Sequence, residues 1–299
     1  MFKNLNINQI KTIKMKNSII GMGLLSIMMV TSCKVSDMRK GTGLHKVDRA
    51  KSSDQTKGKQ ILYAYIKKNG YDKFSSVNTY QVHAHEHWKG MMGNMGNPWP
   101  ESKISYVMKF VPDLNDFTNQ VKLTSKKKKG DIWGMKKTTS SSYYKKSGEA
   151  SKRIKEGMMS FNLANYQWWI EFPYRLSQLK NVTYAGVREK DGQKYDLVLA
   201  TWGNDLKVNK EYDQYLMWFN KATGAMDLVT FTYRNVPMMS PSFMYGTAIF
   251  ENFNTVNGIN IPFSQKFQIN GPSKEKKYAH HFTIDKIDFN SFDKAELLN

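Results

Sequence analysis

The sequence predicts an α+β fold in which a large antiparallel β-sheet is interrupted by one helical segment. From about residue 77, apolar and polar side chains alternate along several stretches, and this period of two is typical of strands with one buried face. The pairs Asp191-Gly192 and Asn257-Gly258 separate such stretches and favour tight hairpin turns. Residues 150–179 instead lack the alternation and are dense in apolar and aromatic side chains, which indicates helix.

The N-terminus has the pattern of a secretory signal. Lys14 and Lys16 precede an uncharged, largely apolar run over residues 19–30, which is short for a helix that spans a bilayer. We expect residues 1–32 to be a lipoprotein signal peptide. Met15 is the candidate translation start, because the residues before it add nothing that a signal needs.

The sequence VTSC at residues 30–33 resembles the bacterial lipobox, with Ser32 before the cleavage point and Cys33 as the lipidated residue. Cys33 is the only cysteine in the chain, which suits a thiol that is consumed by lipidation. A diacylglyceryl group with a third acyl chain, such as palmitate, would anchor the protein stably. The predicted location is the cell envelope, at a membrane and most simply the outer membrane, on its periplasmic or surface side. The alternative is cleavage by an ordinary signal peptidase, but no A-x-A site follows the run.

The chain carries a strong excess of positive charge. The formal net charge is +20, and four lysines but no acidic residue lie in residues 1–32, so residues 33–299 carry +16. This excess favours anionic partners such as lipid headgroups, whereas nucleic acid is not an expected partner of an exported, tethered chain. Much of the charge lies in lysine runs at 125–130 and 273–277, a pattern typical of solvated loops.

Composition divides the exported part into a tether and one domain. Residues 33–57 are polar and poor in large apolar side chains, which predicts a flexible tether. Residues 58–299 are enough for a single large domain. It opens with a short amphipathic helix that ends at Asn69-Gly70 and places four apolar side chains on one face, namely Ile61, Leu62, Tyr65 and Ile66.

The remaining elements follow in chain order. Strands are expected over 77–88, 102–113, 131–139 and 140–146, and the helical stretch 150–179 is expected to break at Pro173, because proline lacks the backbone donor. Three hairpins and a last strand should follow, over 182–202, 212–234, 245–270 and 276–290.

Several of these segments together resemble a known group of proteins. The segments are KNGYDKF at 68–74, FPYRL at 172–176, VTYAGVREKDGQKYDLV at 182–198, DQYLMWFNKATGAMDLVTFTYR at 213–234 and NGINIPF at 257–263. With the lipobox, they resemble Bacteroidota lipoproteins related to the outer-membrane lipoprotein-sorting superfamily, the LolA/LppX/RseB-like fold. The resemblance covers about residues 58–289. It implies a strongly curved antiparallel sheet, an incomplete barrel, whose concave face is capped by helices.

Members of that superfamily hold acyl chains or other hydrophobic ligands between sheet and helices. The resemblance therefore implies a non-enzymatic, membrane-anchored protein without a cofactor. Its ligand would be a lipid or another hydrophobic or amphipathic molecule. The soluble carrier of the superfamily is unlipidated, whereas this chain has Cys33, so binding at a membrane is the nearer analogy. Fold alone does not fix function. The candidate cavity residues lie in the helical segment, and the alternative is that they fill the core: Met158, Met159, Phe161, Trp168, Trp169 and Phe172.

His83, His85 and His87 occupy every second position of the first expected strand and should lie on its more polar face. Their Cβ atoms would be about 6.5–7 Å apart, so two neighbours could share a zinc ion, but three on one straight strand strain tetrahedral geometry. His280 or His281 could add a ligand if the last strand is close. A metal-dependent enzyme using these histidines is one alternative, and a structural or partner-binding envelope protein is another. The sequence has no G-x-S-x-G elbow, P-loop or Rossmann glycine run.

Overall fold

A computed structural model describes residues 36–125, 127–155, 157–234, 244–272 and 277–298 of the chain. These residues belong to one compact unit. The expected signal peptide and Cys33 lie outside the described residues. No helix in the described ranges is both long enough and apolar enough to cross a membrane.

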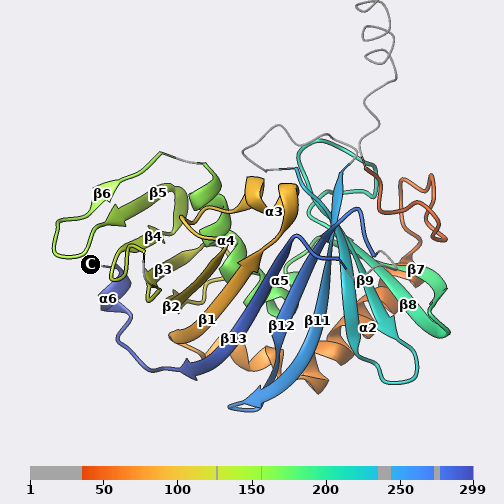
Figure 1. Cartoon of the computed structure of the whole chain (residues 1–299). Helices are drawn as coiled ribbons and strands as arrows, with labels where there is room; N and C mark the ends of the chain where they lie inside the picture. The colour runs from red at the N-terminus through yellow and green to blue at the C-terminus, as the bar shows by residue number, and fades with distance from the viewer. Residues whose placement is uncertain (1–35, 126, 156, 235–243, 273–276, 299) are drawn as a thin grey trace, which may run out of the picture. The chain divides into compact units, whose positions relative to one another are not determined.

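In the described part of the chain, the fold is one antiparallel sheet of thirteen strands (Figure 1). Its order is β6-β5-β4-β3-β2-β1-β13-β12-β11-β10-β9-β8-β7, and β6 and β7 are its two edges. The sheet is bent but not closed, so the predicted α+β class with an incomplete barrel is confirmed. The strands are β1 (Tyr80–Trp88), β2 (Lys103–Val111), β3 (Thr118–Leu123), β4 (Ile132–Lys136), β5 (Thr138–Lys145), β6 (Lys152–Arg153), β7 (Asn181–Lys190), β8 (Gln193–Thr201), β9 (Gln214–Asn220), β10 (Met226–Thr232), β11 (Tyr245–Val256), β12 (Ile259–Ile269) and β13 (His280–Phe289).

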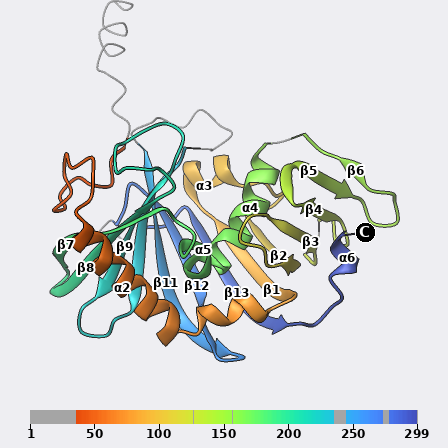
Figure 2. The same cartoon turned by 180° about the vertical axis from the view of Figure 1, so that it is seen from behind.

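Helices cover one face of the sheet, here called the inner face. Figure 2 shows α2, α4 and α5 in front of the strands when the molecule is seen from behind. The helical elements are α2 (Ser52–Lys68), η1 (Tyr71–Ser76), α3 (Gly90–Gly96), α4 (Met158–Ile170), α5 (Phe172–Leu176) and α6 (Ala295–Leu298).

The main core lies between the inner face and these helices and is rich in aromatic side chains. Tyr80 of β1 and Phe110 of β2 are fully buried and stack at a centroid distance of 4.7 Å. Leu62, Tyr65 and Ile66 of α2 are buried as the helical periodicity predicts, and Asn69 caps the C-terminal end of the helix. Burying a side chain of this size contributes about 1.5–3 kcal/mol to folding stability relative to leaving it exposed. The helices and the inner face of the sheet therefore stabilise each other.

The flexible tether predicted over 33–57 is wrong for the described part of that range. Residues 36–50 pack on the outer face, where Met38 and Leu44 join a second apolar cluster with Trp218 of β9, and α2 already begins at Ser52. Side chains on both faces of β9 are buried, so its outer face needs a cover. Composition alone did not predict this packing, because residues 36–50 contain few large apolar side chains.

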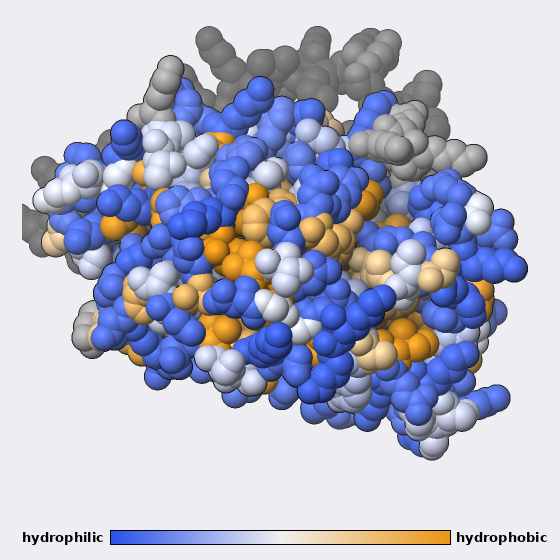
Figure 3. Space-filling model, turned by 90° about the horizontal axis from the view of Figure 1, so that it is seen from below, coloured by the Kyte–Doolittle hydropathy of each residue, from blue (hydrophilic) through white to orange (hydrophobic). Residues whose placement is uncertain are grey.

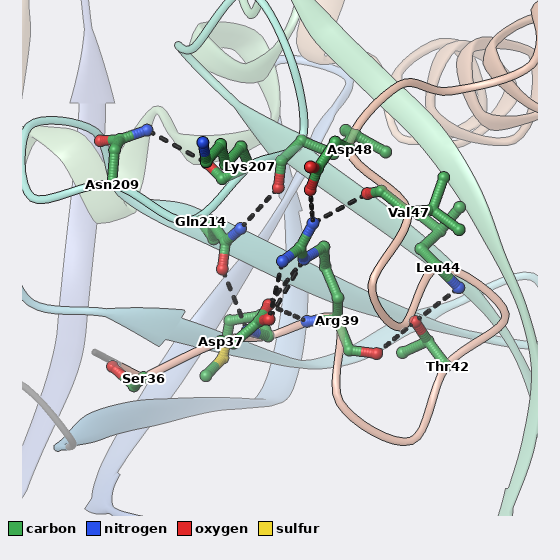
Figure 4. A network of polar contacts seen from close by, with 12 residues as sticks. Ser36, Asp37, Arg39, Thr42, Leu44, Val47, Asp48, Lys207, Asn209 and Gln214 are labelled. Atoms are coloured by element: carbon green, nitrogen blue, oxygen red, sulfur yellow. Dashed lines mark hydrogen bonds and ion pairs between the residues drawn. The ribbon is translucent and has the colours of Figure 1, made fainter. Parts of the chain in front are cut away.

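Arg39 fixes the turns of this covering segment (Figure 4). Its guanidinium pairs with Asp37 at 2.9 Å and with Asp48 at 3.0 Å, and it also donates to the Val47 carbonyl. Gln214 of β9 accepts from the Met38 N–H at 3.0 Å, which ties the segment to the sheet. Polar contacts therefore hold a stretch whose composition resembles a linker.

The helical segment differs in detail from its prediction. Of the described residues between 150 and 179, only those of α4 and α5 are α-helical, and Lys152–Arg153 form the edge strand β6 instead. The break falls at Glu171, and Pro173 lies in the first turn of α5, where its missing N–H leaves no bond unmade. The proline thus starts a helix rather than ending one.

Hydrophilic residues cover most of the face shown in Figure 3, and hydrophobic residues gather there in several separate patches. Lys127, Lys128 and Lys129 of the first lysine run are exposed, in line with the prediction of solvated charge. Residues 273–276 of the second run lie outside the described residues.

Candidate ligand cavity

A cavity of about 410 Å³ lies between the inner face of the sheet and the helices α3 and α4. This volume falls in the range of roughly 300–1,000 Å³ that is usual for small-molecule sites. Its wall is mostly apolar and includes five methionines, whose flexible side chains adapt to irregular ligands. The lining residues are Trp88, Met91, Met92, Met95, Gly96, Met158, Phe161, Asn162, Asn165, Tyr166, Trp169, Phe231, Tyr233, Met244, Gln265, Phe267, Ile269, Ala279, His280 and Phe282.

The candidates from the helical segment fall into different places. Met158, Phe161 and Trp169 line this cavity, whereas Trp168 and again Phe161 line a second one. Met159 packs partly buried against the core, and Phe172 is completely buried within it. Apolar side chains occur on all sides of α4. The helical periodicity therefore did not separate residues of the cavity wall from residues of the core.

Three rings stack on the floor of the cavity. His280 of β13 lies between Trp88 of β1 and Phe267 of β12, its partners in the strand register. Its ring is 3.8 Å from that of Trp88 with an interplanar angle of 6°, and 5.2 Å from that of Phe267. This stack holds the imidazole at a fixed position with its edge free for hydrogen bonding.

Glu86 is a buried carboxylate beside this stack, on the apolar face of β1. Its side chain is 0% exposed and contacts His280 Nε2 at 2.7 Å. Tyr166 of α4 donates its hydroxyl to both carboxylate oxygens, at 2.9 and 3.0 Å, and Trp99 Nε1 donates to that hydroxyl at 2.9 Å. Burial, with the adjacent Glu86 charge, raises the pKa of Tyr166 well above its usual value, so the phenol stays protonated and serves as donor. The chain of contacts links α4 to the sheet.

Gln265 of β12 and the indole Nε1 of Trp88 are unpaired polar groups of the wall, and only Gln265 leaves both a donor and an acceptor unpaired among the described residues. Gln265 is 1% exposed, and neither its Oε1 nor its Nε2 has a hydrogen-bonding partner among the described residues. Its neighbours across the ladders are Phe250 of β11 and Phe282 of β13, which offer no polar atom. A buried amide without partners costs about 1–3 kcal/mol, so this position is unfavourable unless something else meets it.

The buried charged side chains at the C-terminal end of α4 are, in contrast, paired. Arg175 Nε lies 2.8 Å from Glu171 Oε2, and Tyr80 donates to Glu171 Oε1 at 2.8 Å. Gln167 also donates to Glu171, at 3.0 Å, and to the Val111 carbonyl. Burial raises the pKa of Glu171 while Arg175 and these hydrogen bonds oppose the rise.

A second cavity of about 710 Å³ has a more polar lining and lies along the other side of α4, by Trp168, Arg175 and Asp213. Asp213 accepts from the Thr232 hydroxyl at 2.7 Å and from the Arg234 backbone N–H at 2.9 Å. Burial nevertheless raises its pKa to about 6. Since its polar wall offers less apolar surface, we regard the first cavity as the candidate ligand site.

The strand histidines lie on the outer face, away from both cavities. His85 contacts Asp285 at 2.9 Å, and His87 has a pKa lowered by burial and by nearby lysines. His280 points to the inner face, whereas His281 contacts Ser264 on the outer face. Within the described residues, no group of three or more His, Cys, Asp or Glu side chains could hold a metal ion.

Comparison with known proteins gives a fold and no family. No protein-family model matches the chain, and no curated protein matches it either. Among solved structures, the chain is similar to a DUF1329 family protein from Desulfovibrio piger, with a TM-score of 0.51 and 9% identity over 82% of this chain and 97% of that chain. The likeness is one of fold.

Two other solved structures have TM-scores just under 0.5. One is described as an outer membrane lipoprotein-sorting protein domain from Vibrio parahaemolyticus, with a TM-score of 0.49 and 10% identity over 81% of this chain and 97% of that one. The other is a LolA superfamily protein from Nitrosomonas europaea, with a TM-score of 0.47 and 12% identity over the same shares of the two chains.

Proposed function

We propose that this chain is a membrane-anchored lipoprotein that binds a lipid or another hydrophobic ligand between its sheet and the helices α3 and α4, without catalysis. The observation that carries the proposal is the cavity of about 410 Å³ with its largely apolar, methionine-rich wall. A structural envelope protein would have no need of this space, because interiors are normally filled to the density of organic crystals.

The start of the described chain supports a role at a membrane surface. Ser36 donates to the Met244 carbonyl at 2.9 Å, and Arg234 donates to the Ser36 carbonyl at 2.8 Å. Met244 is itself a lining residue. Cys33 precedes Ser36 by three residues, which span at most about 11 Å of extended chain. A lipid on Cys33 would therefore keep the cavity near the membrane from which it takes its ligand.

Two exposed methionines support the same view. Met91 and Met95 of α3 are 74% and 50% exposed, and both line the cavity. Exposed apolar side chains at the rim of a pocket are typical of sites that receive apolar ligands. We propose that the ligand enters between these side chains.

Displacement of N-phenyl-1-naphthylamine, a neutral fluorescent apolar probe, tests the proposal. The probe should bind the wild-type protein and leave it when a long-chain amphiphile is added. Met158→Asp places a charge on the cavity wall, at a helix start where the macrodipole favours an acid. Met158 is half-buried, and the carboxylate would lose part of its hydration when the apolar probe binds, so the variant should weaken probe binding about 10-fold.

Val187→Asp is the matched control, because Val187 is 52% exposed on β7 and does not line the cavity. It should leave the probe affinity unchanged. Absence of probe binding to the wild-type protein, or equal affinity of Met158→Asp and Val187→Asp, would contradict the proposed function. Mass spectrometry of the protein purified from native membranes, read for an acyl modification on Cys33, tests the anchor separately.

A further inference from the structure

The unpaired amide of Gln265 indicates which ligands the cavity accepts. Buried polar side chains in folded proteins have hydrogen-bonding partners with few exceptions, and the exceptions often mark functional positions. Gln265 is 1% exposed, both of its polar atoms lack partners in the described part of the chain, and it lies on the cavity wall. A group that enters the cavity can supply what the protein does not.

Several other polar side chains on this wall are already engaged, and the indole Nε1 of Trp88 is a further buried donor without a partner in the described residues. Asn162 donates to the Met158 carbonyl at 2.8 Å, and Asn165 donates to the Phe161 carbonyl at 2.8 Å. His280 contacts Glu86, and Tyr166 donates to the same carboxylate. Gln265 is therefore the side chain whose donor and acceptor both remain to be met.

The charges around Gln265 exclude an anionic partner. No lysine or arginine is among the lining residues that the structure describes. Gln265 pairs with Phe282 of β13, which pairs in turn with Glu86 of β1. Glu86 is therefore two strands from Gln265, or about 10 Å at the usual strand spacing. A carboxylate or phosphate at Gln265 would lose its hydration without gaining a cation, and this cost is large in an apolar cavity.

We propose that the ligand is a neutral amphiphile whose uncharged hydrogen-bonding group enters the cavity and pairs with Gln265. A primary amide fits best, because it offers one acceptor and one donor to the donor and acceptor of the glutamine. A hydroxyl fits next. A fatty-acid anion or a phospholipid headgroup does not. This inference rests on the proposed function and specifies the ligand class of the same site.

The test compares two amphiphiles of equal chain length, dodecanamide and dodecanoate, as competitors of N-phenyl-1-naphthylamine at pH 8. Wild-type protein should bind dodecanamide at least about 10-fold more tightly than dodecanoate, the difference expected of a buried polar pair. Gln265→Met keeps the length of the side chain and removes its polar atoms. It should weaken dodecanamide binding about 10-fold and leave dodecanoate and the probe little changed.

Equal affinities of wild-type protein for the two amphiphiles, or a preference that survives in Gln265→Met, would overturn the inference while leaving the proposed function intact. Failure of the probe and both amphiphiles to bind would overturn the proposed function and the inference with it. A melting curve of Gln265→Met without ligand confirms that the variant is folded, so a loss of selectivity is assigned to the amide.

Discussion

Two buried polar side chains near α4 are satisfied to different degrees. At the C-terminal end of the helix, Glu171 is completely buried, yet Arg175, Tyr80 and Gln167 meet both of its oxygens. On the cavity wall, Gln265 of β12 is just as deeply buried and has no partner in the described residues. The first side chain fixes the helix to the sheet, and the second leaves a donor and an acceptor facing the cavity. The difference separates positions that serve stability from positions that serve binding.

Glu171→Ala should have the largest effect on this comparison. It leaves the Arg175 guanidinium, which is 2% exposed, without its carboxylate. Removing one member of a buried pair costs about 3–5 kcal/mol, and chemical denaturation would measure the loss of unfolding free energy. Asp72→Ala breaks the exposed ion pair of Asp72 with Lys67 and should change stability little. Equal effects of the two variants would contradict the structural role of Glu171.

Asp213 sharpens the comparison because it is a half-buried carboxylate with neutral hydrogen-bond donors rather than a close cation. Its folded pKa is about 6, raised from 3.8 by burial, so the folded state holds the proton more tightly than the unfolded state. The contribution of Asp213 is therefore fully present below pH 3.8 and is lost as the pH rises through about 6.

Relative to Asp213→Asn, which retains the accepting oxygen, wild-type protein should lose up to ~3 kcal/mol of unfolding free energy across this window. Urea denaturation of both proteins at several pH values from 4 to 7 measures the difference. A difference that does not change with pH would show that the folded carboxyl has its ordinary pKa.

Gln265→Met tests, through the free energy of unfolding, whether the buried amide of Gln265 is unpaired in the protein without ligand. Because it removes a buried amide without partners and keeps the volume, the unliganded variant should be more stable than wild-type protein by about 1 kcal/mol. Thermal melting in the absence of ligand measures the shift. A loss of stability would mean that the protein itself satisfies the amide, which would place Gln265 with Glu171 instead of opposite it.

Met91→Ser combined with Met95→Ser should have the smallest effect on stability, within about 0.5 kcal/mol, because both side chains are exposed. Ligand uptake from vesicles should nevertheless slow, since the apolar rim is lost. Stopped-flow measurement of probe transfer from vesicles to protein gives the rate. An unchanged rate would remove α3 from the entry path.

Much of the fold could be predicted because its signals are local. Asp191 and Asn257 have positive φ values and each precedes a glycine that does too, as the hairpin dipeptides require. The alternation in β1 correctly placed the histidines on the outer face, and the same alternation puts Glu86 on the inner, apolar face. A carboxylate among apolar neighbours was a visible signal of a buried polar site, although its partners Tyr166 and His280 come from distant elements.

The candidate site could be predicted only in part, because the wall is assembled from distant segments. Met158, Phe161 and Trp169 are on the wall, but the ring of apolar residues around α4 gave no reason to separate them from Phe172. Gln265 became conspicuous only once β11 and β13 had placed Phe250 and Phe282 beside it. The register between strands that are formed by distant segments cannot be predicted from a local sequence pattern.

The segment over residues 36–50 has a practical consequence for making the protein in the laboratory. A recombinant chain that starts at Gly58, the boundary that composition suggests, would leave Leu197, Leu216 and Trp218 facing water along neighbouring strands. Such a chain should elute as aggregates from a gel-filtration column, whereas one that starts at Ser36 should elute as a discrete species. Residues 36–50 thus belong in any expression clone, because they cover the outer face of the sheet.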